Sequence, residues 1–238
     1  LLVSKDATIR EIHHRVKNNL QTISSLLRLQ GRRLTEPSAK AAIEESVRRI
    51  RSIALVHETL SREDGDEVDL DEIVRPLVRM VEEGLTSPER PVAFEIRGDG
   101  GKLPSPAATS LAVVLTELLQ NAMDHAYPPG TLAPGEQGRV VIELSLSAGV
   151  LHVTVVDDGV GIRPGFDPET TPSLGLSIVR GLVSELGGSI SFSPAIRPAD
   201  APASGRSGTR VALRVPVVTA LDPDAERPPV EGGRSVGL

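Results

Sequence analysis

The sequence predicts an α+β protein with an N-terminal helical hairpin followed by an α/β sandwich domain. Two amphipathic helical patterns separated by a short break predict the hairpin. Beyond residue 67, helical and strand patterns do not alternate simply, which favours an α+β sandwich over a doubly wound sheet. We expect residues 1–63 to form the hairpin and residues 64–217 to form the sandwich domain. Residues 218–238 are rich in Pro, Gly and acidic residues, so we expect a disordered tail there.

The hairpin is predicted from two helices, over residues 8–34 and 38–60, with a break at Thr35-Glu36-Pro37-Ser38. Apolar residues of the first helix recur at steps of three, four and seven positions, namely Ile9, Ile12, Val16, Leu20, Ile23, Leu27 and Leu34. A two-helix hairpin leaves an apolar face uncovered. We therefore expect a homodimer in which both helices join a four-helix bundle.

The second domain is predicted from shorter patterns. The charged segment 61–67 is expected to be a loop and the hinge between the domains. Strands over residues 139–147 and 151–156 flank the turn Ser147-Ala148-Gly149, which indicates a β-hairpin. The other expected elements are helices over residues 71–83, 105–126 and 174–186, and strands over residues 92–97, 189–193 and 209–215.

Composition excludes several classes of function. The net charge of −6 and the pI near 5.5 argue against direct nucleic-acid binding. The chain has no cysteine, which excludes disulfides, thiolate catalysis and cysteine-ligated metals. No apolar run approaches the roughly 18 residues of a membrane span, so we expect a cytoplasmic protein. The chain starts at Leu1 without Met, and we interpret it as a fragment.

Polar residues recur on one face of the apolar helix 105–126. Glu117, Asn121, Asp124 and His125 lie three or four positions apart, so they share this face. Buried polar groups need partners, and an Asn carbonyl oxygen is a suitable ligand for Mg²⁺. An ordinary amphipathic helix with one solvated side would show the same pattern.

Three further segments extend this pattern along the chain. Asp157-Asp158-Gly159-Val160-Gly161 follows a predicted strand, where a carboxylate can accept a hydrogen bond from an amine such as that of adenine. Ser173-Leu174-Gly175-Leu176 opens a helix, whose free N–H groups suit phosphate oxygens. Gly208-Thr209 enters the last strand. Each segment alone is also compatible with a simple turn or helix cap.

In this order, the four segments resemble the N box, G1 box, G2 box and final Gly-Thr of the Bergerat ATP-binding fold of histidine kinases, gyrase, Hsp90 and MutL. The resemblance covers residues 67–217 and implies an ATP cleft in which Asn121 binds Mg²⁺ and Asp157 reaches adenine. Residues 162–172, which include Pro164, would form the lid. The other residues implied at the nucleotide are Asp124, His125, Gly159, Gly161, Ile162, Ser173, Leu174, Gly175, Leu176 and Thr209.

The chain departs from the family pattern at two positions. Many histidine kinases have Gly in place of Ser173 and a basic residue in place of Asp124. Asp124 cannot help to hold a phosphate. The γ-phosphate contacts must then come from His125 or from a basic residue elsewhere in the chain.

The run Glu11-Ile12-His13-His14-Arg15-Val16-Lys17-Asn18-Asn19-Leu20-Gln21 lies on the first predicted helix. It resembles the H box of the HWE-like and second HisKA-type histidine kinases, whose signature is H-R-x-K-N, and is similar to that of PdtaS-type sensor kinases. This resemblance implies ATP-dependent phosphorylation of a histidine and transfer of the phosphoryl group to an aspartate of a response-regulator receiver domain. PdtaS-type kinases pair with ANTAR regulators, which bind RNA, so nucleic acid would be contacted only downstream.

Helical geometry separates the two adjacent histidines. The apolar stripe centres near Val16, and at about 100° per residue His13 lies roughly 60° from that centre and His14 roughly 160° from it. An acceptor that visits an ATP site and then a partner must be exposed, and the family places its acceptor directly before the Arg. Both arguments favour His14, with His13 as the alternative.

Asn18 lies one turn from His14 on the same face and could orient its ring or an attacking water. Glu11 could accept the Nδ1 proton of His14 and fix its tautomer. Glu117 is the other candidate for the general base. Two other functions stay open: a Bergerat-fold serine kinase, against which the H box argues, and a non-catalytic dimeric ATP-binding scaffold.

Overall fold

The computed structural model describes residues 2–62, 67–163, 165–195 and 206–217, with side chains from Thr8 onward. The tail expected at residues 218–238 and Pro164 of the expected lid lie outside the described residues, as does most of the expected hinge. Across the part of the chain that the structure describes, no helix has both the length and the apolar character needed to cross a bilayer.

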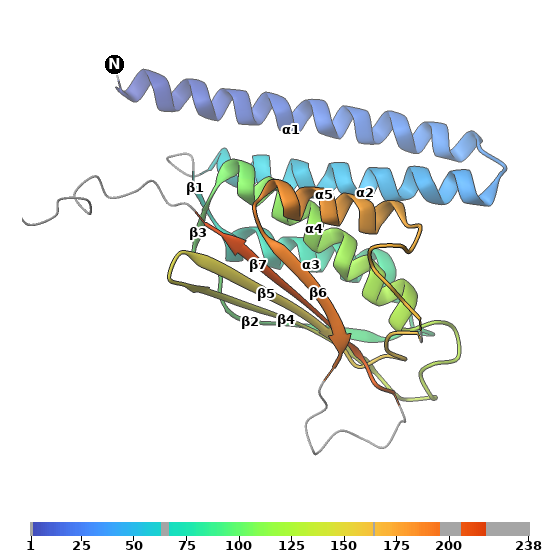
Figure 1. Ribbon diagram of the computed structural model, residues 1–238. Helices are drawn as coiled ribbons and strands as arrows, with labels where there is room; N and C mark the ends of the chain where they lie inside the picture. The colour runs from blue at the N-terminus through green and yellow to red at the C-terminus, as the bar shows by residue number, and fades with distance from the viewer. Residues whose placement is uncertain (1, 63–66, 164, 196–205, 218–238) are drawn as a thin grey trace, which may run out of the picture.

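The hairpin consists of α1 (Leu2–Arg33) and α2 (Pro37–Leu60), which pack along each other, and the N-terminal part of α1 extends beyond the end of α2 (Figure 1). The proline at the start of α2 suits the first helical position, because the fixed φ of proline fits the helix and its missing N–H has no partner there. The helix bounds agree with the predicted ranges to within a few residues, except that α1 extends further toward the N-terminus.

The second domain contains all the helices and strands that the sequence patterns predict. The remaining elements are β1 (Glu67–Asp69), α3 (Leu70–Leu85), β2 (Val92–Asp99), β3 (Lys102–Pro104), α4 (Ser105–Asn121), the π-helical turn η1 (Ala122–Ala126), β4 (Gly138–Ser147), β5 (Val150–Asp157), α5 (Leu174–Glu185), β6 (Ser189–Pro194) and β7 (Thr209–Pro216). The short pair β1 and β3 was not predicted, because three residues are too few to show an alternating pattern.

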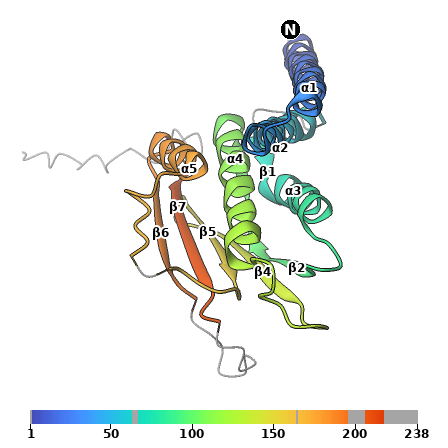
Figure 2. The same cartoon turned by 90° about the vertical axis from the view of Figure 1, so that its right-hand side faces the viewer.

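A mixed five-stranded sheet forms one layer of the domain, with strand order β2-β4-β5-β7-β6. β2 pairs with β4 in parallel, and the other neighbours are antiparallel. Helices α3, α4 and α5 cover one face of this sheet, as Figure 2 shows. The α+β sandwich predicted from the sequence is therefore confirmed.

The core of the sandwich continues into the hairpin. Val56 and Leu60 near the end of α2 are buried in the same apolar cluster as Ile73 of α3, Leu115 of α4 and Ile142 of β4. The boundary expected between residues 63 and 64 thus separates elements that share one core. α2 lies between α1 on one side and α3 and α4 on the other (Figure 2).

Candidate nucleotide and phosphoacceptor sites

A cavity of about 570 Å³ lies between the end of α4, η1, the start of α5, strands β5, β6 and β7, and the segment that follows β5. Its volume falls in the range typical of small-molecule sites. More than half of the residues that the sequence predicts at a nucleotide line it. They are Asn121, His125, Asp157, Gly161, Ile162, Ser173, Leu176 and Thr209.

The other predicted nucleotide residues lie beside the cavity and do not line it. Asp124 accepts a hydrogen bond from Gln120 Nε2 at 3.3 Å. Leu174 is exposed at the start of α5, and Gly159 packs beneath the cavity against the end of η1. Gly175 follows Leu174 and packs against the carboxylate of Glu117.

Asp157 stands at the end of β5 and is buried. Its Oδ1 accepts hydrogen bonds from the backbone N–H of Gly159 at 3.0 Å and from that of Thr209 at 3.1 Å. Burial raises the pKa of Asp157 to about 6, although these two N–H donors act in the opposite direction. The hydroxyl of Thr209 also hydrogen-bonds to this carboxylate. Among the described residues, no backbone N–H donates to its second oxygen, Oδ2.

The loop after Asp157 can pack closely against the end of η1 only because it contains glycine. A Cβ on Gly159 would lie 2.2 Å from the carbonyl oxygen of Ala126, and Val160 N donates to the same oxygen at 3.0 Å. Gly161 adopts a φ of +84°, which L-residues with side chains rarely adopt. These contacts fasten the loop to the end of η1 and so fix the floor of the cavity.

The apolar helix changes its winding at the cavity. α4 ends at Asn121, and the next five residues form a single π-helical turn. Such turns are uncommon and occur frequently at functional sites. Here the turn carries His125, which lines the cavity together with Asn121.

The start of α5 presents backbone N–H groups toward the cavity. Ser173 is the N-cap residue, and its Oγ accepts from Leu176 N at 3.4 Å. Ser173 and Leu176 both line the cavity. The remaining free N–H groups and the positive end of the helix dipole are suited to phosphate oxygens.

Among the cavity-lining residues that the sequence analysis did not single out, three have aromatic or charged side chains. Phe166, in the expected lid, packs edge-to-face on Phe192 of β6, with ring centroids 5.8 Å apart. Arg163 also lines the cavity and has no ion-pair partner among the described residues. No motif marked them, although Phe166 and Phe192 are two of only three phenylalanines in the chain. Arg163 and His125 are the basic side chains that line this cavity. Both suit contact with phosphate, whereas the acidic side chain of Asp124 does not.

The two adjacent histidines of α1 have different surroundings. His14 is exposed, whereas His13 is half-buried, and its Nδ1 lies 3.0 Å from Nδ1 of His57 on α2. Burial, and secondarily the neighbouring His13, lower the pKa of His57, so this pair holds at least one neutral ring. The arrangement agrees with the helical geometry expected from the sequence, with His14 on the solvent side.

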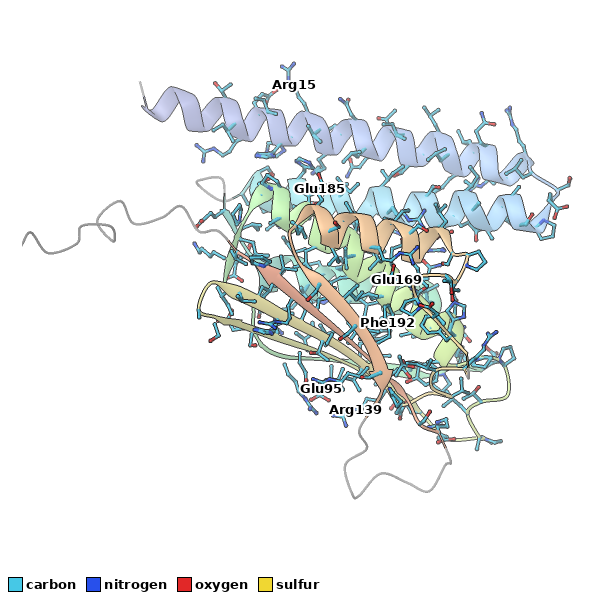
Figure 3. All side chains as sticks on the ribbon, in the orientation of Figure 1. Arg15, Glu95, Arg139, Glu169, Glu185 and Phe192 are labelled. Carbon is cyan, nitrogen blue, oxygen red and sulfur yellow. The ribbon has the colours of Figure 1, made fainter. Side chains whose placement is uncertain are left out.

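Neither candidate general base touches His14. Glu11 accepts from Arg15 Nε at 2.7 Å, and hydrogen bonding to Arg15 lowers its pKa. Arg15 points away from α2, as Figure 3 shows. Glu117 is buried on α4 and forms an ion pair with Arg49 of α2. Asn18 is exposed one turn beyond His14.

His14 does not line the cavity, and α2 lies between α1 and α4 (Figure 2). The structure therefore shows two separate features in one chain. One is an exposed histidine on α1. The other is a cavity lined by a helix N-cap residue, a buried carboxylate and two basic side chains.

Two family models match the chain. A model described as histidine kinase, HisKA_2, matches residues 11–84, which include the two histidines. A second model, described as histidine kinase-, DNA gyrase B- and HSP90-like ATPase, matches residues 107–219, which include the whole cavity.

Curated relatives match over most of the chain. The sensor histidine kinase PdtaS of Mycobacterium tuberculosis is 48% identical over 217 residues, which cover 91% of this chain and 40% of that protein. PdtaS of Mycolicibacterium smegmatis is also 48% identical and is covered to 41%. The chain thus spans about two fifths of the length of these relatives.

A solved structure shows the same fold. The histidine kinase domain of the blue-light-activated histidine kinase EL346 from Erythrobacter litoralis superposes with a TM-score of 0.61 at 24% sequence identity. The match covers 90% of this chain and 96% of that domain.

Proposed function

Because this chain belongs to the histidine kinase family, with a HisKA_2 region followed by the HATPase domain, we propose that it transfers the γ-phosphoryl group of ATP to His14. The observation that carries the proposal is the exposed His14 of the H-R-V-K-N run in the same chain as a cavity lined by Asn121, Asp157 and Ser173. The HATPase domain implies ATP binding, and the residues of the cavity fit this ligand.

Each end of the cavity suits one end of ATP. Oδ2 of Asp157 can accept from the exocyclic amine of adenine, because Oδ1 is already occupied by two backbone N–H groups. The N-terminus of α5 can donate to phosphate oxygens. Arg163 and His125 can add positive charge, and Phe166 on Phe192 can cover the apolar part of the cavity against water.

Asn121 is the residue that we propose as a ligand of Mg²⁺. Within the described residues, no group of three or more His, Cys, Asp or Glu side chains could hold a metal ion. This agrees with a magnesium site that is completed by the phosphates of the nucleotide, which is the usual arrangement for Mg²⁺. When bound, the ion supplies charge neutralisation on the phosphates.

The chain must bring His14 in line with the terminal phosphorus, because phosphoryl transfer depends mainly on positioning and electrostatics. A neutral imidazole is a sufficient nucleophile near pH 7, since its unperturbed pKa is about 6.5. Because His14 is exposed to solvent, its ring is accessible for attack on the terminal phosphorus. The hairpin and the ATP-binding domain must therefore move relative to each other, and we propose segment 61–67 as the hinge.

We further propose that the phosphoryl group passes from His14 to an aspartate of a response-regulator receiver domain. The similarity to PdtaS favours an ANTAR-type regulator, so that this chain itself binds no nucleic acid. The net charge of −6 argues against direct nucleic-acid binding, and the lack of cysteine suits a reducing cytoplasm.

A dimer is proposed from the uncovered face of α1. Ile23, Leu26 and Leu29 are exposed there by 44%, 57% and 55%, which is uncommon for large apolar side chains so close together. Pairing of two hairpins would bury this face in a four-helix bundle.

Replacing Leu26 and Leu29 with Glu is expected to convert the dimer to a monomer, because four buried carboxylates would meet at the bundle seam. Light scattering after size-exclusion chromatography measures the mass. Leu146→Glu is the matched control, since Leu146 is also apolar and exposed but lies on β4. A dimer that survives the double substitution would contradict this interface.

The proposed reaction is tested by incubating the chain with Mg²⁺ and γ-³²P-labelled ATP. We expect label that is stable in alkali and lost in acid, as a phosphorus–nitrogen bond requires. Acid-stable label would instead identify a serine kinase of the same fold. ATP binding without any label would identify a non-catalytic scaffold.

A further inference from the structure

A buried ion pair joins the hairpin to the ATP-binding domain. Arg49 of α2 donates from Nε to Oε1 of Glu117 at 2.6 Å and from Nη2 to Oε2 at 3.0 Å. The exposed fractions of the two side chains are only 13% and 3%. Such a two-point guanidinium–carboxylate pair fixes both distance and orientation between two helices.

The preceding residue of α2 makes a second contact with the same part of α4. Arg48 Nε donates to Oε1 of Gln120 at 2.7 Å. Glu45 of α2 also pairs with Arg49. We call Arg48, Arg49, Glu117 and Gln120 the α2–α4 latch.

The latch includes Glu117, which is one of the two candidates for the general base. Glu117 lies one turn before Asn121 on α4, and its Oε2 lies 2.5 Å from where a Cβ of Gly175 would stand, at the start of α5. It is therefore adjacent to the nucleotide cavity but does not line it. The ion pair holds both carboxylate oxygens of Glu117 against Arg49 of α2.

The same contact holds the cavity apart from His14. While α4 is fastened to α2, α2 stands between α4 and the helix that carries His14 (Figure 2). Opening the latch exposes both ionic groups to water together, so no charge is left buried without a partner.

We propose that Arg49 is a positioning residue that holds this chain in a resting state. In this state Glu117 is paired with Arg49, and the ATP-binding domain is docked on α2. Phosphorylation of His14 then requires the latch to open. The proposal rests on the proposed function, since it concerns the rate of that reaction.

A reversible crosslink tests the latch directly. The chain has no cysteine, so Arg48→Cys with Gln120→Cys creates the only two thiols. A bis-maleimide with a central disulfide joins them, and a reducing agent later cuts the linker. We expect the crosslinked chain to bind a fluorescent ATP analogue with unchanged affinity, to lose autophosphorylation, and to regain it after reduction. Crosslinked chain that phosphorylates His14 at the rate of the reduced chain overturns the proposal.

A second experiment uses substitutions at Arg49. Arg49→Gln is expected to raise the autophosphorylation rate at saturating ATP by at least about fivefold, a typical size for coupling between sites. Arg49→Lys, which keeps the charge, should return the rate toward that of the unsubstituted chain. Nucleotide affinity should not change. A rate that falls in Arg49→Gln, or rises equally in both variants, contradicts a resting latch.

The two proposals fail in different ways. If the unsubstituted chain takes no acid-labile label under any condition, the proposed function is wrong, whatever the crosslink does. If that chain is labelled but the crosslink has no effect, only the latch is wrong.

Discussion

His14→Gln is expected to abolish phosphorylation of the chain, at least to the limit of detection. The glutamine side chain resembles imidazole in polarity but has no nucleophilic nitrogen, so no phosphorus–nitrogen bond can form. His14 is exposed and has no contact in the cavity, so the variant should keep its melting temperature and its affinity for ATP. Radiolabelling and nucleotide titration of the same preparation measure both quantities.

His13→Gln is the matched control for this prediction. His13 is half-buried against His57, so its loss should lower the stability of the hairpin while label is still incorporated. If His13→Gln removes the label and His14→Gln keeps it, the assignment of the acceptor from exposure is wrong.

Asp157→Asn is expected to weaken ATP binding by about 100-fold, which corresponds to nearly 3 kcal/mol. The Asn carbonyl oxygen must replace Oδ1 as acceptor for the N–H groups of Gly159 and Thr209. Its NH₂ group then takes the place of Oδ2 and presents a donor to the adenine amine, which is also a donor. Titration with a fluorescent ATP analogue measures the loss.

The same variant should fold well, and the effect of pH shows why. Burial raises the pKa of Asp157 from 3.8 to about 6, so the folded state favours the neutral acid. The stability that this preference contributes is fully present below pH 3.8 and is lost as pH rises through about 6. Asn carries no charge at any pH, so Asp157→Asn should gain stability relative to Asp157 as pH rises from 4 to 7.

Asp158→Asn provides the control for Asp157→Asn. Asp158 is the next residue, but its Oδ1 accepts from Tyr127 and from the backbone N–H of Arg139, outside the cavity lining. We expect nucleotide affinity close to that of the unsubstituted chain. Equal loss of affinity in both variants would show that loop integrity, and not the amine contact, explains the effect.

The sequence predicted those features that depend on local patterns. Period and length defined α1, α2 and the longer strands, and glycine spacing located the loop after Asp157. The exposure of His14 followed from its angle on the helix. The strands β1 and β3 escaped prediction because they are short and pair only through long-range contact.

The contacts between distant segments could not be predicted from one sequence. Arg49 and Glu117 are far apart in the chain, and nothing near either residue indicates the other. Phe166 meets Phe192 only because the segment that follows β5 packs against β6. The packing of Leu60 into the core of the second domain is likewise a tertiary feature, which blurs the boundary expected at residue 63.

The proposed reaction is defined by which residue receives the phosphoryl group. Tandem mass spectrometry under non-acidic conditions, applied to the chain after reaction with Mg²⁺ and ATP, can locate the phosphoryl group on a peptide spanning residues 11–21. If His14 is the acceptor, the added mass first appears at His14 in the fragment series. Added mass at His13, on a serine or threonine, or on no residue at all would contradict it.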